Sequence, residues 1–520
     1  MDITVEEAAQ RLGISTATVK RRLVRGQIAG RKVGRQWIVD DSKLPAPTRF
    51  GSQKPLLIST ANVAEALQYV KVTDLNELWV PDILRWTDFI AKPVGLLADA
   101  ASRAVTGSCD APTQIEVPKT PMLTRPAAML TLADRVAFQA LVSILLPATD
   151  AALSPRVYSS RATSRMPHLF KKPTTQWVQW HRRVAKEVKA GAIWVAKTDL
   201  SAYFESIDHR ILFEELSAVG ASEEVLKPLR DFLKAWSRTP GRGLPQGPNA
   251  SHALGNFYMA AVDEAVLHCN INYWRYMDDI MIVAPTKAEA MAGMRFFERE
   301  CRKRGLVLNA HKTKLLTGGQ AAEAGGDPAK DDAQYLMDSN QATKAKKELR
   351  RILYEALRHE GSVDVGAATF SLWRLAQLMD KAPLRRVLYR LEDLGPVARI
   401  SAAYLRKFLA EPSVEEALSA FVADTARNTS PVTESWLFAC MLEHPGNLPG
   451  AWIDRARIVT ADRNGPSYHR ALAVNVMVLN ALPADIAWVK NELRRDYDPQ
   501  MLRAYLVSLA RVGELALKQA

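Results

Sequence analysis

The spacing of apolar residues near the N-terminus predicts a small separate domain. Apolar positions between Val5 and Leu12 follow helical spacing, and a second helix is predicted over residues 18–25. A glycine-bearing turn and a short alternating strand follow that helix. Residues 1–44 are therefore interpreted as helix, turn, helix and β-wing, and residues 45–60, which include a proline-bearing stretch, as a linker.

The rest of the chain shows two further patterns. Residues 61–339 mix helical and strand patterns, whereas residues 340–520 form one helical pattern after another without a strict repeat period. Stacked helix pairs, as in a solenoid, are predicted for this last region, and a plain helical bundle is the alternative. The segment 318–332 is rich in glycine and acidic residues and is expected to be a mobile loop. The predicted fold class is multidomain α+β.

Composition narrows the range of functions. The 520 residues are 48% hydrophobic and 24% charged, which is ordinary for globular proteins and excludes disordered, collagen-like and coiled-coil chains. No window holds the ~18 uninterrupted apolar residues that a membrane span needs, and the N-terminus does not resemble a signal peptide. Four cysteines without a CxxC pair exclude a zinc ribbon and indicate a reducing, cytoplasmic location.

Positive charge points to a polyanionic partner. Lys and Arg number 69 against 56 Asp and Glu, which gives a formal net charge of +13. Cations gather on the second N-terminal helix and on the wing, namely Lys20, Arg21, Arg22, Arg25, Arg31, Lys32 and Arg35. The pattern resembles the excisionase/MerR-like winged helix-turn-helix family, which implies contact with DNA phosphates. A small adaptor domain is the alternative interpretation.

The most informative residues are two adjacent aspartates between apolar strands. The stretch NYWRYMDDIMIVA predicts a β-hairpin with Asp278 and Asp279 at its turn, and Asp199 ends another apolar run in AIWVAKTD. Neighbouring ionised carboxylates repel each other, so their placement together requires a compensating cation. Between these segments, GRGLPQGPNASHALGNFYM predicts a rigid glycine- and proline-bearing loop that leads into a helix.

The order of these three segments resembles the palm of reverse transcriptases, over roughly residues 110–317. The resemblance implies right-hand polymerase fingers and palm within residues 61–339. It assigns Asp199 and Asp278 as ligands of two Mg²⁺ ions, with Mn²⁺ as a substitute, and Asp279 as a nearby third carboxylate. Leu200 is expected to offer its backbone carbonyl to the metal.

The same resemblance implies residues that contact the incoming nucleotide. Phe204 corresponds to the aromatic side chain that excludes ribonucleotides by crowding the sugar 2′-position, and a plain core role is the alternative. Gln246 and Gly247 of the LPQG loop correspond to residues beside the nucleotide. Two segments resemble the fingers motifs and supply further candidate nucleotide-binding cations, namely Lys119, Arg125, Arg135 and Arg161. Lys312 is a candidate to protonate the leaving pyrophosphate.

The chain also departs from the family pattern. After Leu316 we expect a short hydrophobic hairpin that grips the primer, and the glycine-rich acidic segment stands there instead. The first helix of the C-terminal region carries Lys346, Lys347 and Arg350 opposite apolar residues, and it is predicted to lie along a nucleic-acid backbone. A compact polymerase with a long helical region resembles the abortive-infection and defence-associated bacterial reverse transcriptases.

The sequence therefore predicts an RNA-directed DNA polymerase used in antiviral defence, with deoxynucleotides, template and primer as partners. Protein-primed or untemplated synthesis fits the same resemblance. A retron-like or domesticated enzyme that copies a dedicated non-coding RNA is one alternative. A DNA-binding regulator with an inactive polymerase core is another, and the intact carboxylate set argues against it. The sequence is compatible with a homo-oligomer.

Overall fold

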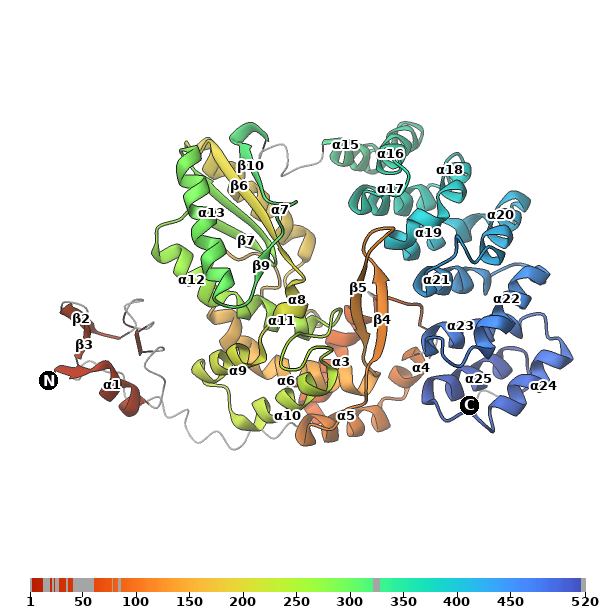
Figure 1. Cartoon of the computed structure of the whole chain (residues 1–520), viewed down its shortest axis with the longest axis horizontal. Coiled ribbons are helices and arrows are strands. Elements are labelled where there is room, and N and C mark those ends of the chain that lie inside the picture. Colours follow the sequence, from red (N-terminus) through yellow and green to blue (C-terminus); the bar gives the residue numbers. More distant parts are fainter. Residues whose placement is uncertain are drawn as a thin grey trace. The chain divides into compact units, whose positions relative to one another are not determined.

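The computed structural model divides the chain into two compact units (Figure 1). The first unit comprises Met1–Asn76, Pro93–Ala111 and Leu130–Gly325, and the second comprises Glu77–Lys92, Pro112–Met129 and Gly326–Ala520. The structure describes residues 2–12, 19–20, 23, 28–33, 36–40, 60–76, 78–82, 86–320 and 328–515.

The N-terminal domain has the predicted first helix and strand. Helix α1 spans Val5–Leu12, and a capping box begins it, because Thr4 Oγ1 accepts from the Glu7 amide (3.1 Å) while Glu7 Oε2 accepts from the Thr4 amide (2.8 Å). The sheet order is β1-β3-β2, formed by Asp2–Thr4, Gln36–Asp40 and Gly30–Val33. Strand β1 was not predicted. Most of the predicted second helix, including Arg21, Arg22 and Arg25, lies outside the described residues, as do Arg35 and most of the linker.

Helices form much of the remaining first unit. Their bounds are α3 Thr60–Val72, α5 Val94–Thr106, α6 Leu132–Ala151, α8 Tyr203–Ser206, α9 His209–Ala218, α10 Glu223–Trp236, α11 Asn249–Tyr258 and α12 Ala260–His268. Among the described residues, only α6 is long and apolar enough to cross a membrane by length and composition, and 72% of its apolar window is buried inside the fold. The apolar residues of α6 are therefore explained by its position in the core of this unit.

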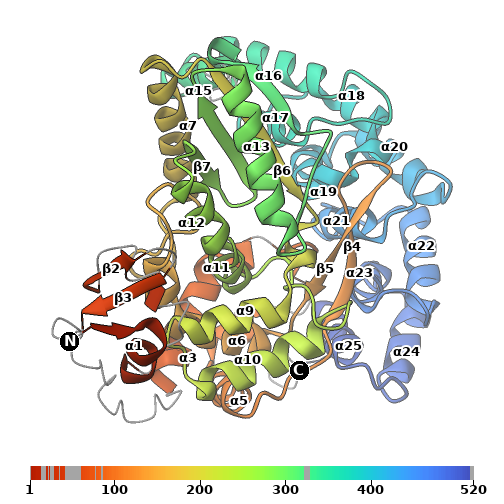
Figure 2. The ribbon, with the colours of Figure 1, turned by 60° about the vertical axis from the view of Figure 1, so that its left-hand side comes forward.

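A five-stranded antiparallel sheet carries the aspartate segments. Its order is β10-β6-β8-β7, and β9 also pairs with β6. The strands are β6 Trp194–Ser201, β7 Tyr273–Tyr276, β8 Asp279–Ala284, β9 Val307–Leu308 and β10 Lys314–Thr317. Alternation along the strands separates two buried faces. Helices α7 (Pro173–Lys189) and α13 (Lys287–Arg302) lie against the sheet (Figure 2). Trp180 and Val184 of α7 pack on one face, and Phe297 of α13 contacts Tyr273 on the other.

The second unit is largely helical, as predicted for residues 340–520. Its helices follow one another in chain order (Figure 1), and several begin with a proline or a capping Asp or Ser side chain. The bounds are α4 Trp86–Ala91, α15 Pro328–Asp338, α16 Ala342–Ala356, α17 Val365–Gln377, α18 Leu384–Tyr389, η3 Leu391–Val397, α19 Ala398–Leu405, α20 Pro412–Ala423, α21 Pro431–Met441, α22 Gly450–Ala461, α23 Ser467–Met477, α24 Pro483–Glu492 and α25 Pro499–Arg511. Because residues 318–320 are helical and α15 begins at Pro328, the prediction of a loop throughout 318–332 is wrong at both ends.

A β-hairpin from the fingers segment belongs to this helical unit. Strands β4 (Thr113–Pro118) and β5 (Thr124–Met129) pair antiparallel, and their apolar residues Ile115, Val117 and Ala127 share one core with the helices. The predicted boundary at residues 339/340 therefore does not follow the packing.

Candidate active site

Three carboxylates converge at one end of the β6–β8 ladder. Asp199 lies in β6 and is 7% exposed, and its register partner across the ladder is Asp279, the first residue of β8. Asp278 occupies the β7–β8 turn, where its carbonyl accepts from the Leu200 amide (3.3 Å). The structure thus brings together the aspartates that the sequence predicted as metal ligands, and Leu200 lies beside them.

The electrostatics of this cluster resist full ionisation. Burial raises the pKa of Asp278 to about 7, with further contributions from the charges of Asp199 and Asp279. Burial also raises the pKa of Asp279, although the nearby Lys197 opposes that shift. Additional positive charge at the cluster would therefore favour full ionisation of Asp278 at neutral pH.

Lys312 supplies part of that charge. Its Nζ lies 2.5 Å from Asp199 Oδ2. Partial burial disfavours the charged ammonium, but the hydrogen bond and charge of Asp199, together with the other two aspartates, outweigh burial and raise the pKa of Lys312. The predicted proton donor thus stands at the carboxylates and is protonated at neutral pH.

The donor set fits Mg²⁺ bound with the help of other ligands. Among the described residues, no three His, Cys, Asp or Glu side chains are already grouped so that they alone could hold a metal ion. Mg²⁺ commonly uses one or two protein carboxylates and completes its shell with waters and substrate phosphates. Asp199 and Asp278 can provide these carboxylates, and a divalent cation would offset the burial and the charge repulsion that raise the pKa of Asp278.

The LPQG loop is fastened to the helix that carries Phe204. The Leu244 amide donates to the Phe204 carbonyl (2.9 Å), and Gln246 Nε2 donates to Glu205 Oε1 (3.3 Å). Gly247 has a φ of 120°, which a residue with a Cβ rarely adopts. Phe204 is half-buried, and a Cβ added to Gly255 of α11 would lie 3.1 Å from its ring. These contacts place Phe204, Gln246 and Gly247 in one local structure.

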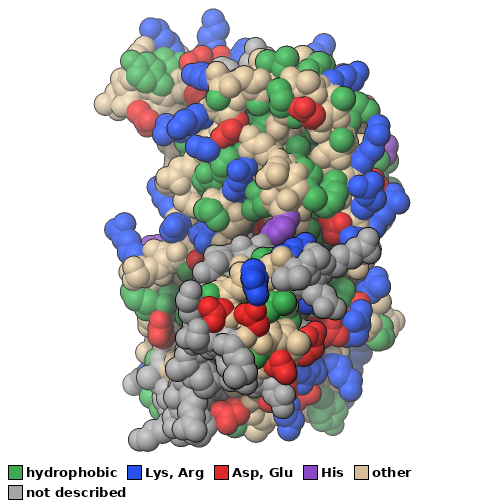
Figure 3. Space-filling model, turned by 90° about the vertical axis from the view of Figure 1, so that its left-hand side faces the viewer, with side chains coloured by type: hydrophobic (Ala, Val, Ile, Leu, Met, Phe, Trp, Pro, Cys, Tyr) green, Lys and Arg blue, Asp and Glu red, His purple; other side chains and the backbone are tan. Residues whose placement is uncertain are grey.

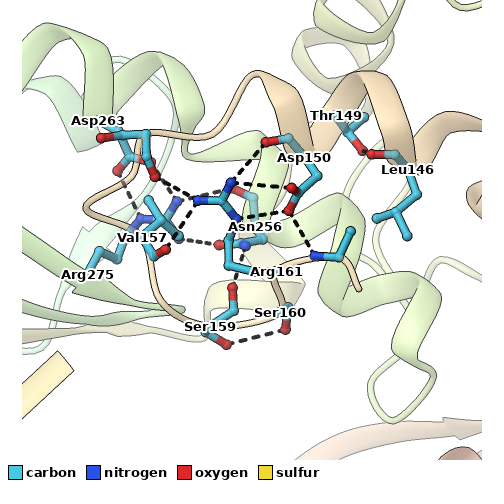
Figure 4. Close-up of polar contacts among 12 residues, drawn as sticks. Leu146, Thr149, Asp150, Val157, Ser159, Ser160, Arg161, Asn256, Asp263 and Arg275 are labelled. Atoms are coloured by element: carbon cyan, nitrogen blue, oxygen red, sulfur yellow. Dashed lines mark hydrogen bonds and ion pairs between the residues drawn. The ribbon is translucent and has the colours of Figure 1, made fainter. Parts of the chain in front are cut away.

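Two of the predicted fingers cations have internal partners. Arg135 is 3% exposed, its NH1 lies 3.3 Å from Asp74 Oδ2, and burial lowers its pKa. Arg161 Nε donates to Asp150 Oδ1 (2.9 Å), and its NH1 donates to the Ser154 carbonyl (2.9 Å; Figure 4). In this structure both guanidinium groups hold the fold of the first unit together.

The other predicted cations lie in the second unit or the N-terminal domain. Lys119 and Arg125 belong to the β4–β5 hairpin segment, and Arg125 stacks on Trp79, 5.5 Å from the ring centroid. On α16, Arg350 makes a bidentate ion pair with Asp380 (2.6 and 2.7 Å), whereas Lys346 is half-buried and Lys347 exposed.

In the N-terminal domain, Arg31 pairs with Asp2 (2.7 Å), and Lys20 and Lys32 are exposed. Figure 3 shows one face of the molecule, on which Lys and Arg side chains are spread among Asp and Glu side chains.

Sequence reasoning missed one residue at the site, Arg275. Its guanidinium is 0% exposed, and NH1 donates to the Met277 carbonyl (3.0 Å) in the turn that carries Asp278. Asp263 and Asn256 accept its other hydrogen bonds (Figure 4). The sequence did hold a signal for this residue, which is the arginine inside the apolar strand YWRYM. A charge in a buried strand needs buried partners, so this arginine indicates a buried polar network.

An antiparallel sheet with carboxylates at a hairpin and on the adjacent strand is the arrangement expected of a polymerase palm. Residues 117–348 match the model of the family described as Reverse transcriptase (RNA-dependent DNA polymerase). Residues 3–44 match the model of a helix-turn-helix domain. The chain therefore carries a reverse transcriptase domain preceded by a helix-turn-helix domain.

Individual relatives are distant. Protein YkfC of Escherichia coli (strain K12) is 23% identical over 247 residues, which cover 39% of this chain and 62% of that relative, so the chain spans about six-tenths of its length. Among solved structures, telomerase from Candida albicans with a fragment of telomeric RNA has a TM-score of 0.32 at 10% identity, covering 63% of each chain. A partial Cas6-RT-Cas1–Cas2 complex has a TM-score of 0.29 at 18% identity, covering 56% of this chain and 51% of that one.

Proposed function

We propose that this protein is an RNA-directed DNA polymerase that adds deoxynucleotides to a primer end. The observation that supports this most directly is the convergence of Asp199, Asp278 and Asp279 at one end of the β6–β8 ladder, within the matched reverse transcriptase domain. Lys312 at the same carboxylates and the LPQG loop beside Phe204 complete a set suited to nucleotidyl transfer.

Each group has a separate part in the proposed reaction. Asp199 and Asp278 would hold two Mg²⁺ ions, which would supply charge stabilisation to the attacking hydroxyl and the triphosphate. Lys312 pairs with Asp199 (2.5 Å) and is positioned to give a proton to the leaving pyrophosphate. Phe204 limits the room at the sugar 2′-position, and Gln246 lies on the loop that approaches the base pair.

Extension of a labelled DNA primer on RNA and DNA templates tests this function. We expect Mg²⁺- or Mn²⁺-dependent incorporation of deoxynucleotides by the purified protein and loss of incorporation in Asp199→Asn. Phe204→Ala should raise incorporation of ribonucleotides relative to deoxynucleotides, because the steric block is removed. Incorporation by Asp199→Asn at the rate of the unmodified protein would refute the assignment of the metal site.

We further propose that the enzyme serves antiviral defence. Support comes from the sequence resemblance to defence-associated reverse transcriptases and from the long helical region that follows the polymerase domain. Sequencing of nucleic acid that co-purifies with the protein distinguishes the modes of synthesis. DNA covalently attached to the protein would favour protein priming, whereas one defined RNA would favour a retron-like enzyme that copies a dedicated template.

The helix-turn-helix domain supports an additional contact with DNA. Deletion of residues 1–44 should weaken duplex binding and lower the log–log salt slope by about 0.9 for each lost phosphate contact. Primer extension should persist, because the carboxylates lie outside this domain. If the deletion leaves the salt slope unchanged, the domain contacts protein instead. A protein that binds DNA through this domain and never polymerises would be a regulator with an inactive core.

A further inference from the structure

One buried arginine connects four parts of the first unit. All five N–H donors of Arg275 have acceptors, and those on Asp263 and Asn256 are drawn in Figure 4. Nε and NH2 bind Asp263 of α12 (2.9 and 2.6 Å). NH1 binds Asn256 Oδ1 of α11 (2.7 Å) and the Met277 carbonyl (3.0 Å), and NH2 also binds the Asn256 carbonyl (3.2 Å). No other side chain offers this planar set of five donors.

The turn held by Arg275 has an unfavourable backbone conformation. Met277 has a φ of 54°, in the left-handed region that residues other than glycine rarely adopt. Such a conformation costs on the order of 1–3 kcal/mol and persists only where the surroundings enforce it. The hydrogen bond from Arg275 fixes the carbonyl of Met277, and the next residue in the turn is Asp278.

The same arginine is tied to the elements that are proposed to contact the nucleotide. Asn256 lies on α11, which directly follows the LPQG loop, and its Nδ2 donates to the Ser159 carbonyl (2.8 Å). The backbone of Arg275 also pairs with the segment around Val157, through the Arg275 amide to the Arg156 carbonyl (3.1 Å) and the Tyr158 amide to the Arg275 carbonyl (3.0 Å). Arg275 therefore contacts helix α11, the 156–161 segment and the β7–β8 turn that carries Asp278.

We propose that Arg275 is a positioning residue for nucleotidyl transfer, which sets the orientation of Asp278 by fixing the Met277 carbonyl against Asn256 and Asp263. This inference rests on the proposed polymerase function. Stability of the fold does not by itself require such a group, because apolar replacements of buried ion pairs are often neutral or stabilising. The specific consequence of losing it is a turn that no longer holds its carboxylate in place for the metal.

The decisive variant removes both charges together. Arg275→Met with Asp263→Asn leaves no unpaired buried charge, and the new Asn can still accept from Tyr273 Oη, which donates to Asp263 in the native protein (2.7 Å). Arg275→Lys keeps the positive charge but cannot supply five donors. The matched control is Arg304→Met with Glu215→Gln, since Arg304 also makes a bidentate pair (2.7 and 2.8 Å) in the same unit but has no contact with the turn.

Three measurements separate positioning from general stability. In the Arg275→Met/Asp263→Asn variant, we expect kcat for primer extension to fall about 10- to 100-fold, the range given by losing one hydrogen bond to a charged donor. Hydrogen–deuterium exchange should accelerate at residues 276–279 more than elsewhere, and Mn²⁺ titration of the protein without nucleotide should show weaker binding. Arg275→Lys should be intermediate. The control pair should match the unmodified protein in exchange at the turn and in Mn²⁺ affinity.

Two outcomes would overturn the inference. One is normal kcat, local exchange and Mn²⁺ affinity in a folded double variant. The other is acceleration of exchange throughout the unit to the same degree as at the turn, which would make the network purely structural. If the unmodified protein shows no polymerase activity, the proposed function fails, while the exchange and Mn²⁺ measurements still decide whether Arg275 controls the turn.

Discussion

The palm sheet and the β4–β5 hairpin are both antiparallel, and both come from the segment that resembles a reverse transcriptase, yet they are stabilised in different ways. The sheet buries Val195, Met281 and Val283 against α7, a helix that immediately precedes β6. The hairpin buries Ile115 and Val117 in a core built mostly from helices that follow residue 326. The sheet completes this core within the first unit, and the hairpin depends on helices of the C-terminal region.

The chain that enters and leaves the hairpin is anchored in the first unit. Arg103 pairs with Asp110, just before the hairpin, at 2.7 Å and with Asp134, just after it, at 2.8 Å. The Asp110 amide also donates to Asp134 Oδ2 (3.1 Å). One continuous sequence motif thus supplies elements to two packing units. The helical region completes the core of the fingers hairpin.

The largest expected effect is that of truncating the chain after Asn340. A 1–340 fragment keeps the hairpin but loses most of the core that buries Ile115, Val117 and Ala127. Exposed apolar strands promote aggregation. We therefore expect little soluble fragment and no primer extension, measured by soluble yield and by product length on a denaturing gel.

Deletion of the N-terminal domain provides the control for that truncation. Removing residues 1–44 should leave soluble, active enzyme, because the buried residues of the N-terminal domain form a core of their own. A soluble 1–340 fragment that makes full-length product at the normal rate would show that the hairpin does not need the helices.

The second-largest expected effect is the loss of activity on substitution of Asp278, in the β7–β8 turn of the sheet. Asp278→Asn should lower primer extension by roughly 10³-fold or more, since metal-based charge stabilisation is worth several kcal/mol. The melting temperature should hold or rise, because the substitution removes a buried carboxylate whose pKa is raised by burial and by Asp199 and Asp279. A variant that loses activity together with its cooperative melting transition would contradict this separation of site from fold.

The palm was predictable from the sequence because its signals are local. Apolar runs around Asp278 and before Asp199 predicted the strands, and the pairing of β7 with β8 follows from their hairpin. The pairing of β6 with β8 joins segments far apart in the sequence, and it was implied only by the resemblance to reverse transcriptases. Arg275 was overlooked because its partners, Asn256 and Asp263, lie on helices whose approach to the strand is a tertiary property.

The assignment of the hairpin to the helical unit could not be predicted for a similar reason. Alternation at Ile115 and Val117 marks a face to be buried, but it does not state which distant helices bury it. The guanidinium groups of Arg135 and Arg161 illustrate the same limit. Their sequence context indicated nucleotide contact, whereas the fold supplies them with Asp74 and Asp150.

A third prediction tests the contact between the hairpin and the helices directly. A Cβ added at Gly395 of η3 would lie 3.1 Å from Pro118 Cβ and 3.3 Å from Thr433 Oγ1. Gly395→Ala should therefore destabilise the second unit by about 1–3 kcal/mol through overpacking, measured by denaturant unfolding. Gly446→Ala is the matched control, since nothing lies within 4 Å of its added Cβ. Equal stability of the two variants would mean that the hairpin shifts without cost.

The smallest expected effect is an opposite pH dependence of the two units. Asp278 in the sheet has a pKa raised to about 7 by burial and by Asp199 and Asp279, so metal-free stability is full at low pH and is lost as pH rises through about 7. Glu434 in the helical unit behaves oppositely. Burial alone would raise its pKa, but hydrogen bonds from His469 and Arg455 outweigh burial and lower it, so stability is lost only in acid.

Calorimetry without metal should show the melting transition of the first unit moving up by about 2–4 °C per kcal/mol of stability gained between pH 8 and pH 5.5, while the transition of the second unit stays constant. Mg²⁺ or Asp278→Asn should abolish the shift, and a shift that persists in Asp278→Asn would assign it to other groups.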